Sequence, residues 1–151
     1  MEKHKSYRTL TRVFVFLCCS YFSCSYATQA IELCAVPLQE IVASIIKPFV
    51  AGMWHVFVRG ADKTGLNFEP KNPLLLFGGK ARIGRQNYPN ATCEPIFTTE
   101  DPEEYKIKWQ EIVEAYDTAA RIYKYNLSHK NCQHVTREII KALGYVTPKS
   151  S

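Results

Sequence analysis

The sequence lacks the patterns of two common classes, zinc proteins and nucleic-acid-binding proteins. It contains no Cys-x-x-Cys pair, and its cysteines and histidines do not follow the spacing of a structural zinc site. A nucleic-acid-binding surface needs concentrated basic residues interleaved with aromatics, and no such patch is found. We interpret a small basic cluster, Lys80, Arg82 and Arg85, as a solvated strand or loop face. The sequence therefore predicts no metal, no cofactor and no nucleic-acid partner.

A long apolar run is missing as well. The apolar stretch that begins at Val13 is short and interrupted by serines, so it is not expected to span a bilayer comfortably. Basic residues precede it, and Ser25-Tyr26-Ala27 follows it with the small-x-small pattern of a cleavage site. We therefore predict a signal peptide over residues 1–27, export to a secreted or periplasmic location, and one domain over residues 28–151.

An uncleaved N-terminal segment is the alternative interpretation of the same stretch. It would anchor the chain, together with the apolar region 31–50, and it is the part of the sequence expected to contact a membrane.

The cysteines are few once the predicted signal is removed. Of the six in the sequence, Cys34, Cys93 and Cys132 remain. An odd number of cysteines in an exported protein leaves at least one thiol unpaired. A Cys34–Cys93 disulfide with a free Cys132 is the simplest arrangement, but the sequence alone does not fix the pairing.

Hydrophobic periodicity predicts an α+β domain, in which a helix precedes a small antiparallel sheet and two helices follow. Asp101 and Pro102 form a strong helix start, and Gly144 is well placed to end the last helix. The expected elements are a helix over 31–49, strands over 53–60 and 66–69, short strands over 74–77 and 81–84, a loop over 85–99, and helices over 101–123 and 132–143.

Cys132 lies at the expected start of the last helix and is a candidate nucleophile. Unpaired N–H groups and the helix dipole favour a negative charge there, so we expect the pKa of the thiol to be lowered. The alternative is a buried, inert cysteine, since free cysteines are among the most buried residues.

His55 is the candidate base for this thiol. It interrupts an otherwise apolar strand, whereas His129 precedes the helix and His134 need not converge with the thiol. Asn67 lies across the expected hairpin and offers an amide oxygen that fixes the imidazole tautomer. The alternative is that His55 is a hydrogen-bonded histidine of the core.

The order of these motifs resembles a known superfamily. A strand histidine in Trp54-His55-Val56, a polar residue on the next strand and Asn131-Cys132-Gln133-His134 opening a helix are similar to the circularly permuted branch of the NlpC/P60 papain-like superfamily. That branch includes the lecithin:retinol acyltransferase-like proteins, and the PPPDE peptidases have a similar order. The chain departs from the acyltransferase-like pattern, because Asn67 stands where a second histidine is usual and Val135 replaces an aromatic residue.

The resemblance implies a permuted papain-like fold and a thiol hydrolase or acyltransferase. Cys132 would be the nucleophile, His55 the base and Asn67 the residue that orients the base. The substrate would be a peptide, a cell-wall peptide or a lipid ester. The competing hypothesis is a non-catalytic exported interaction protein, such as an effector, an inhibitor or an envelope factor, in which Cys132 is structural.

Overall fold

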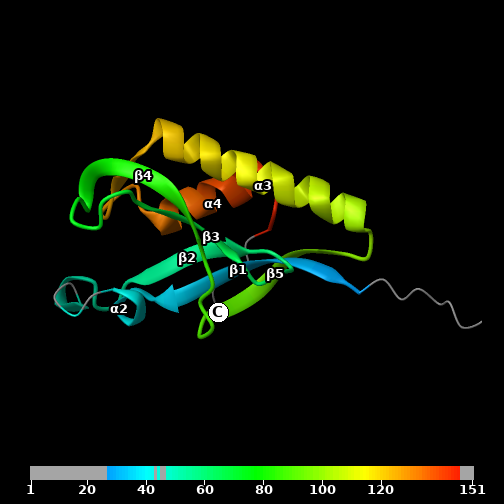
Figure 1. Ribbon diagram of the computed structural model, residues 1–151, viewed down its shortest axis with the longest axis horizontal. Helices are drawn as coiled ribbons and strands as arrows, with labels where there is room; N and C mark the ends of the chain where they lie inside the picture. Colours follow the sequence, from blue (N-terminus) through cyan, green and yellow to red (C-terminus); the bar gives the residue numbers. More distant parts are fainter. Residues whose placement is uncertain (1–26, 43, 45–46, 147–151) are drawn as a thin grey trace, which may run out of the picture.

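The computed structural model describes residues 27–42, 44 and 47–146, and it has the α+β architecture expected from the sequence. Figure 1 shows a twisted sheet with two long helices, α3 and α4, lying together on one of its sides. The elements, in order, are β1 (Gln29–Pro37), α2 (Leu38–Ile41), η1 (Lys47–Phe49), β2 (Trp54–Arg59), β3 (Gly65–Pro70), β4 (Phe77–Gln86), β5 (Thr92–Thr99), α3 (Pro102–Ile122), β6 (Lys124–Asn126) and α4 (Cys132–Ala142).

The six strands form one antiparallel sheet in the order β5-β1-β2-β3-β4-β6. Because side chains alternate between the faces of a strand, each face has its own cluster. The face toward the helices carries the main core, which contains the following buried residues: Ile31, Val58, Leu66, Phe68, Ile112, Tyr116, Ala119, Tyr125, Val135, Ile139 and Ile140.

The second face carries a smaller cluster. It contains Cys34, Val36, Phe57 and Tyr88. Tyr88 belongs to the short segment 87–91, which joins β4 on one side of the sheet to β5 on the other. This crossover brings Tyr88 against the start of β2, where His55 lies.

The helix predicted over residues 31–49 is wrong. Ile31 to Pro37 belong to β1, a strand that pairs with both β2 and β5, and only the short α2 and η1 follow it. The helical spacing of Leu38, Ile41 and Val42 extends over about one turn of helix, after which Val42 is already extended. Residues 43, 45 and 46 lie outside the described part of the chain.

The middle of the chain holds more strand than the sequence predicted. Leu74 and Leu75 precede β4, which continues through Gly79 to Gln86 as one strand instead of two. The expected loop over 85–99 contains β5, which pairs with β1 despite Pro95. The three-residue β6 was not predicted either, and it extends the sheet beyond β4.

The other helices and strands agree with the prediction. The hairpin of β2 and β3 is present, and α3 begins at Pro102 with Asp101 as its N-cap. The predicted signal peptide, apart from Ala27, lies outside the described residues. Within the described residues, no helix combines the length and apolar character needed to cross a membrane.

Candidate functional site

The predicted partnership between His55 and Asn67 is present in the structure. The Nε2 atom of His55 lies 2.9 Å from the Oδ1 atom of Asn67, and both side chains are buried. Because Oδ1 can only accept a hydrogen bond, Nε2 carries the proton in this arrangement. The Nδ1 atom is then the unprotonated nitrogen, the one that can act as a base.

Two further residues continue this network on the same face of the sheet. The Tyr88 hydroxyl accepts a hydrogen bond from Asn67 Nδ2 at 3.4 Å and donates one to Gln86 Oε1 at 2.8 Å. The Tyr88 ring also contacts the imidazole of His55, with 5.3 Å between ring centroids. Neither residue was predicted, because both lie in the segment 85–99 that was expected to be a loop.

Cys132 is the first residue of α4, as predicted, and its thiol is free. Asn131 caps the helix, because its Oδ1 accepts the His134 backbone N–H at 3.1 Å. The same oxygen lies 2.8 Å from His134 Nδ1, while Asn131 Nδ2 donates to the Leu127 carbonyl. Asn131 and His134 therefore position the helix start, and His134 does not converge on the thiol.

The start of α4 packs where β2 and β3 part. Their ladder consists of the pairs Val58–Leu66 and Arg59–Gly65, so the N-terminal part of β2 turns its free backbone groups toward the helix. The Thr136 hydroxyl donates a hydrogen bond to the Val56 carbonyl at 3.3 Å, and the Val56 backbone N–H lies close enough to the Cys132 thiol to lower its pKa. Cys132 and Thr136 are one turn apart on α4, so both lie against the same strand residue, Val56.

The expected lowering of the Cys132 pKa is wrong. The thiol is 3% exposed, and this burial raises its pKa. Backbone hydrogen bonds from Val56, Gln133 and Cys132 itself lower the pKa but do not outweigh the burial. A helix start therefore does not make this cysteine a thiolate, because the surrounding side chains exclude water from it.

The pKa of the His55 imidazole shifts in the opposite direction, downward. The imidazole is 5% exposed, and burial lowers its pKa, while the hydrogen bond to Asn67 and the charge of Glu69 partly oppose the shift. With the thiol pKa raised and the imidazole pKa lowered, both groups are uncharged at neutral pH.

His55 and Cys132 approach the same residue of β2. His55 directly precedes Val56, whose backbone contacts the thiol. Among the described residues, no hydrogen bond joins the His55 ring to the thiol, and no acceptor or donor engages His55 Nδ1. The structure thus pairs His55 with Asn67 on the second face of the sheet, while Cys132 reaches the backbone of the next residue of β2 from the side of α4. Within the described part of the chain, no contact between the imidazole and the thiol is found.

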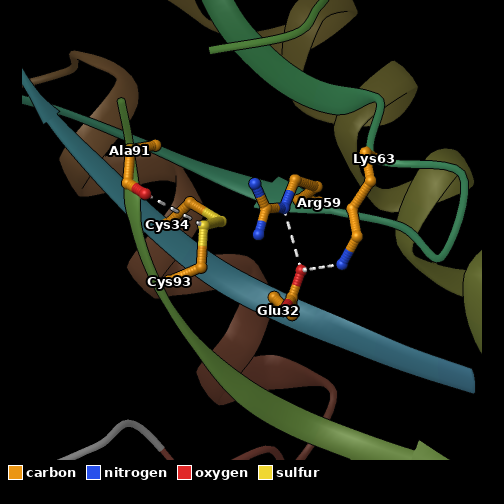
Figure 2. The surroundings of a disulfide bond; sticks show 6 residues. All are labelled: Glu32, Cys34, Arg59, Lys63, Ala91 and Cys93. Carbon is orange, nitrogen blue, oxygen red and sulfur yellow. Dashed lines mark hydrogen bonds and ion pairs between the residues drawn. A yellow bond between two sulfur atoms is a disulfide. The ribbon is translucent and has the colours of Figure 1, made fainter. Parts of the chain in front are cut away.

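The other two cysteines of the described residues, Cys34 and Cys93, form a disulfide that links β1 to β5, which is the simplest of the pairings that the sequence left open (Figure 2). Glu32 lies beside it and pairs with Arg59 at 2.8 Å and Lys63 at 3.4 Å. The Glu32 oxygen and the two sulfur atoms lie within 4.8 Å of one another, but the sulfur atoms are bonded to each other and do not provide thiolates for a metal ion.

Comparison with family models, curated proteins and solved structures gives no match to this chain.

Proposed function

We propose that this protein is an exported thiol hydrolase or acyltransferase that cleaves an amide or ester bond with Cys132 and His55. The observation that carries the proposal is the buried hydrogen bond between His55 Nε2 and Asn67 Oδ1. This bond holds the imidazole in the tautomer whose Nδ1 can accept a proton. His55 directly precedes Val56, the residue whose backbone lies against the thiol. The order of these residues resembles the permuted NlpC/P60 papain-like branch, and we propose that the chain is a member.

The proposed reaction starts from an uncharged pair. As the Cys132 sulfur attacks the substrate carbonyl, its proton passes to His55 Nδ1, and the carbonyl oxygen becomes an oxyanion. The backbone N–H groups of Cys132 and Gln133, which have no acceptor within the helix, stabilise that charge. His55 then gives the proton to the leaving amine or alcohol, which leaves a thioester on Cys132. Water or an acyl acceptor, deprotonated by His55, resolves the thioester and restores the thiol.

Substrate must reach a site that is nearly closed. Cys132 and His55 are 3% and 5% exposed, whereas Trp54, the neighbour of His55, is 51% exposed. We place the approach to the site beside Trp54, and the rings of Phe57 and Tyr88, which pack against the imidazole, must move to uncover it. A peptide, a cell-wall peptide or a lipid ester each supplies the carbonyl that the reaction needs.

A non-catalytic interaction protein is the second candidate. The observation that favours it is the placement of both Cys132 and Thr136 against the backbone of Val56, which gives the cysteine a structural role. In that case His55 and Asn67 form a hydrogen-bonded pair of the second face, and export delivers a binding protein instead of an enzyme.

Turnover of activated substrates tests the proposal. We expect the protein to hydrolyse p-nitrophenyl esters or peptide anilides, and Cys132→Ala to abolish this activity. His55→Gln is expected to slow it by about a hundredfold or more, the usual contribution of a general base. Ser128→Ala, in the exposed loop before α4, is the control and should leave the rate unchanged. Equal rates in wild type and Cys132→Ala would refute catalysis by this cysteine, provided circular dichroism shows that both are folded.

A further inference from the structure

The loop between β3 and β4 and the first residue of β4 present apolar side chains to solvent. Leu74, Leu75 and Phe77 are 83%, 53% and 68% exposed, and we call these three residues the apolar tip. Single exposed apolar residues are ordinary, but neighbouring ones on a projecting loop mark an interaction site. The tip is therefore a surface for which the proposed chemistry gives no reason.

The conformation of this loop is held by its own hydrogen bonds. Asn72 accepts the backbone N–H of Leu74 through Oδ1 and that of Leu75 through its carbonyl. The Leu76 carbonyl accepts the Leu127 backbone N–H at 2.8 Å, which ties the loop to the segment before α4. Gly78, the second residue of β4, has a φ of +95°, a conformation that permits the irregularity between Phe77 and Gly79 where β4 pairs with β6. The apolar side chains are thus presented by an ordered loop.

Three lysines lie in register with one another next to the apolar tip. Lys71 donates its backbone N–H to the Lys80 carbonyl, and Lys80 is the register partner of Lys124 on β6. We call Lys71, Lys80 and Lys124 the lysine row. All three are exposed, and none has a carboxylate within 4.0 Å among the described residues. Like charges directly across strands repel one another, so the row favours an anionic partner.

The residues around the lysine row add further positive charge and no negative charge. The stretch from Pro70 to Cys93 contains four basic residues and no acidic one. Two of them, Lys71 and Lys80, belong to the lysine row, and Arg82 is neutralised by Glu69 at 2.7 Å.

We infer that the apolar tip and the lysine row dock the protein on an anionic lipid surface. An apolar group of this kind enters the boundary between headgroups and acyl chains, while lysines bind the anionic headgroups. A protein partner would need a matching apolar pocket ringed by acids, whereas an anionic bilayer supplies both features without a specific shape.

The docking surface lies at the end of the molecule that carries the candidate site. Because β2 and β3 are antiparallel, the last residues of β3 and the first residues of β2 lie at the same end of the sheet. Figure 1 shows the β3–β4 connection at the same end as α2 and the start of α4. The inference stands on the exposed residues and does not depend on the proposed catalysis. If both hold, docking brings Cys132 near a lipid ester.

Sedimentation of the full chain with vesicles tests this inference. The vesicles contain phosphatidylcholine alone or mixed with phosphatidylserine. We expect more binding to the mixed vesicles and a decrease with added salt, because salt screens exposed charges. Replacing Leu74, Leu75 and Phe77 together by serine should reduce the partition coefficient at least tenfold. Replacing the lysine row by glutamine should reduce it by about fivefold per lysine.

Matched variants control for general loss of hydrophobicity and charge. Serine at Ile107, Ile122 and Val146 removes apolar groups of similar exposure, 58%, 64% and 83%, from other places. Glutamine at Lys106, Arg137 and Lys141 removes the same charge. Residues 1–26 are common to all variants, so they do not contribute to the differences. Equal binding by the tip variant and wild type, or equal binding to both lipid mixtures, would overturn the inference. So would self-association through the tip without vesicle binding.

Discussion

Asn67 sets the tautomer of His55 through a single buried hydrogen bond. The amide itself is held by the Tyr88 hydroxyl, which remains protonated because burial raises the pKa of Tyr88 to about 12. A chain of Gln86, Tyr88, Asn67 and His55 therefore orients one nitrogen without placing a charge beside it. The uncharged pair of thiol and imidazole follows from the low exposure of this network.

The opposite pKa shifts of His55 and Cys132 predict that stability is greatest between their ordinary values. Burial lowers the pKa of His55 from 6.5, so below that pH the unfolded chain binds a proton that the folded chain does not. The free energy of unfolding therefore falls as the pH falls. Burial raises the pKa of Cys132 from 9.0, so above that pH the unfolded chain loses a proton that the folded chain keeps, and the free energy of unfolding falls as the pH rises.

Urea unfolding at a series of pH values measures both effects. We expect the free energy of unfolding of His55→Gln to depend less on pH below 6.5 than that of wild type. We expect the free energy of unfolding of Cys132→Ser to depend less on pH above 9.0. An acidic dependence that is identical in wild type and His55→Gln would show that the imidazole is not buried as described.

Tyr88→Phe tests the orientation of Asn67. The substitution removes the hydroxyl but keeps the ring that packs against His55. We expect the free energy of unfolding to decrease by about 1 kcal/mol, the usual net value of a hydrogen bond, and ester hydrolysis to slow while Cys132 remains intact.

Tyr105→Phe is the control for this experiment, because it removes a hydroxyl that accepts the Ala61 backbone N–H away from the site. If the two variants lose stability equally but only Tyr88→Phe loses activity, Tyr88 positions the base. Unchanged hydrolysis in Tyr88→Phe would mean that Asn67 holds its orientation without it.

At the scale of the elements, α4 attaches to β2 through Thr136 as well as Cys132. The buried Thr136 hydroxyl donates to the Val56 carbonyl and lies 2.7 Å from the Tyr116 hydroxyl. Thr136→Val should lower the free energy of unfolding by about 1–3 kcal/mol, because it leaves two buried polar groups without their partner. Chemical denaturation measures this change, and Thr118→Val on the exposed side of α3 is the matched control. A loss no larger than that of the control would mean that water satisfies Val56.

The elements also show what the sequence could and could not predict. The hairpin of β2 and β3 and the long α3 were predictable because periodicity, the Gly60 break and the Asp101 cap agree. Residues 31–37 were misassigned because a strand buried on both faces has the same apolar composition as a core helix. The strand β5 was missed because Pro95 opposes it, and its pairing with β1 depends on contacts far apart in the chain.

The candidate site was predictable in the same uneven way. His55, Asn67 and Cys132 were chosen from residue type and position, and the hydrogen bond between the first two is present. Tyr88 was missed because its place against His55 depends on a crossover between distant strands. The direction of the Cys132 pKa was wrong because local helix geometry is visible in a sequence, whereas the burial that decides the shift is not.

At the scale of the whole molecule, the Cys34–Cys93 disulfide closes a separation of 59 residues. Chain-entropy reasoning assigns a loop of this length about 4 kcal/mol of stability, within a general range of roughly 2–5 kcal/mol for native disulfides. We expect the double variant Cys34→Ala/Cys93→Ala to unfold at a correspondingly lower urea concentration.

Wild type treated with reductant should unfold at the same lower urea concentration as that variant. Cys132→Ser keeps the disulfide, so reductant should lower its unfolding midpoint as it does in wild type. A midpoint that does not move on reduction would show that the disulfide contributes nothing to stability. Since disulfides persist in oxidising compartments, the pairing also supports the proposed export.

The whole-molecule view adds a second proposed region of membrane contact to the one expected from the sequence. The sequence suggested contact through the N-terminal segment, whereas the inferred docking surface lies in the middle of the chain, at Leu74, Leu75 and Phe77. Apolar tip and candidate site lie at one end, so an enzyme with this shape would meet a bilayer with its site turned toward the lipid.

Detection of an acyl group on Cys132 tests the central claim most directly. The folded protein is mixed with a p-nitrophenyl ester, quenched in acid within a turnover and analysed by peptide mass spectrometry. We predict an acyl adduct on the peptide that contains Cys132, formed about a hundredfold more slowly in His55→Gln. Absence of the adduct from the folded wild type, or its formation at the same rate without the imidazole, would contradict the account and leave Cys132 as a structural residue of the junction between α4 and β2.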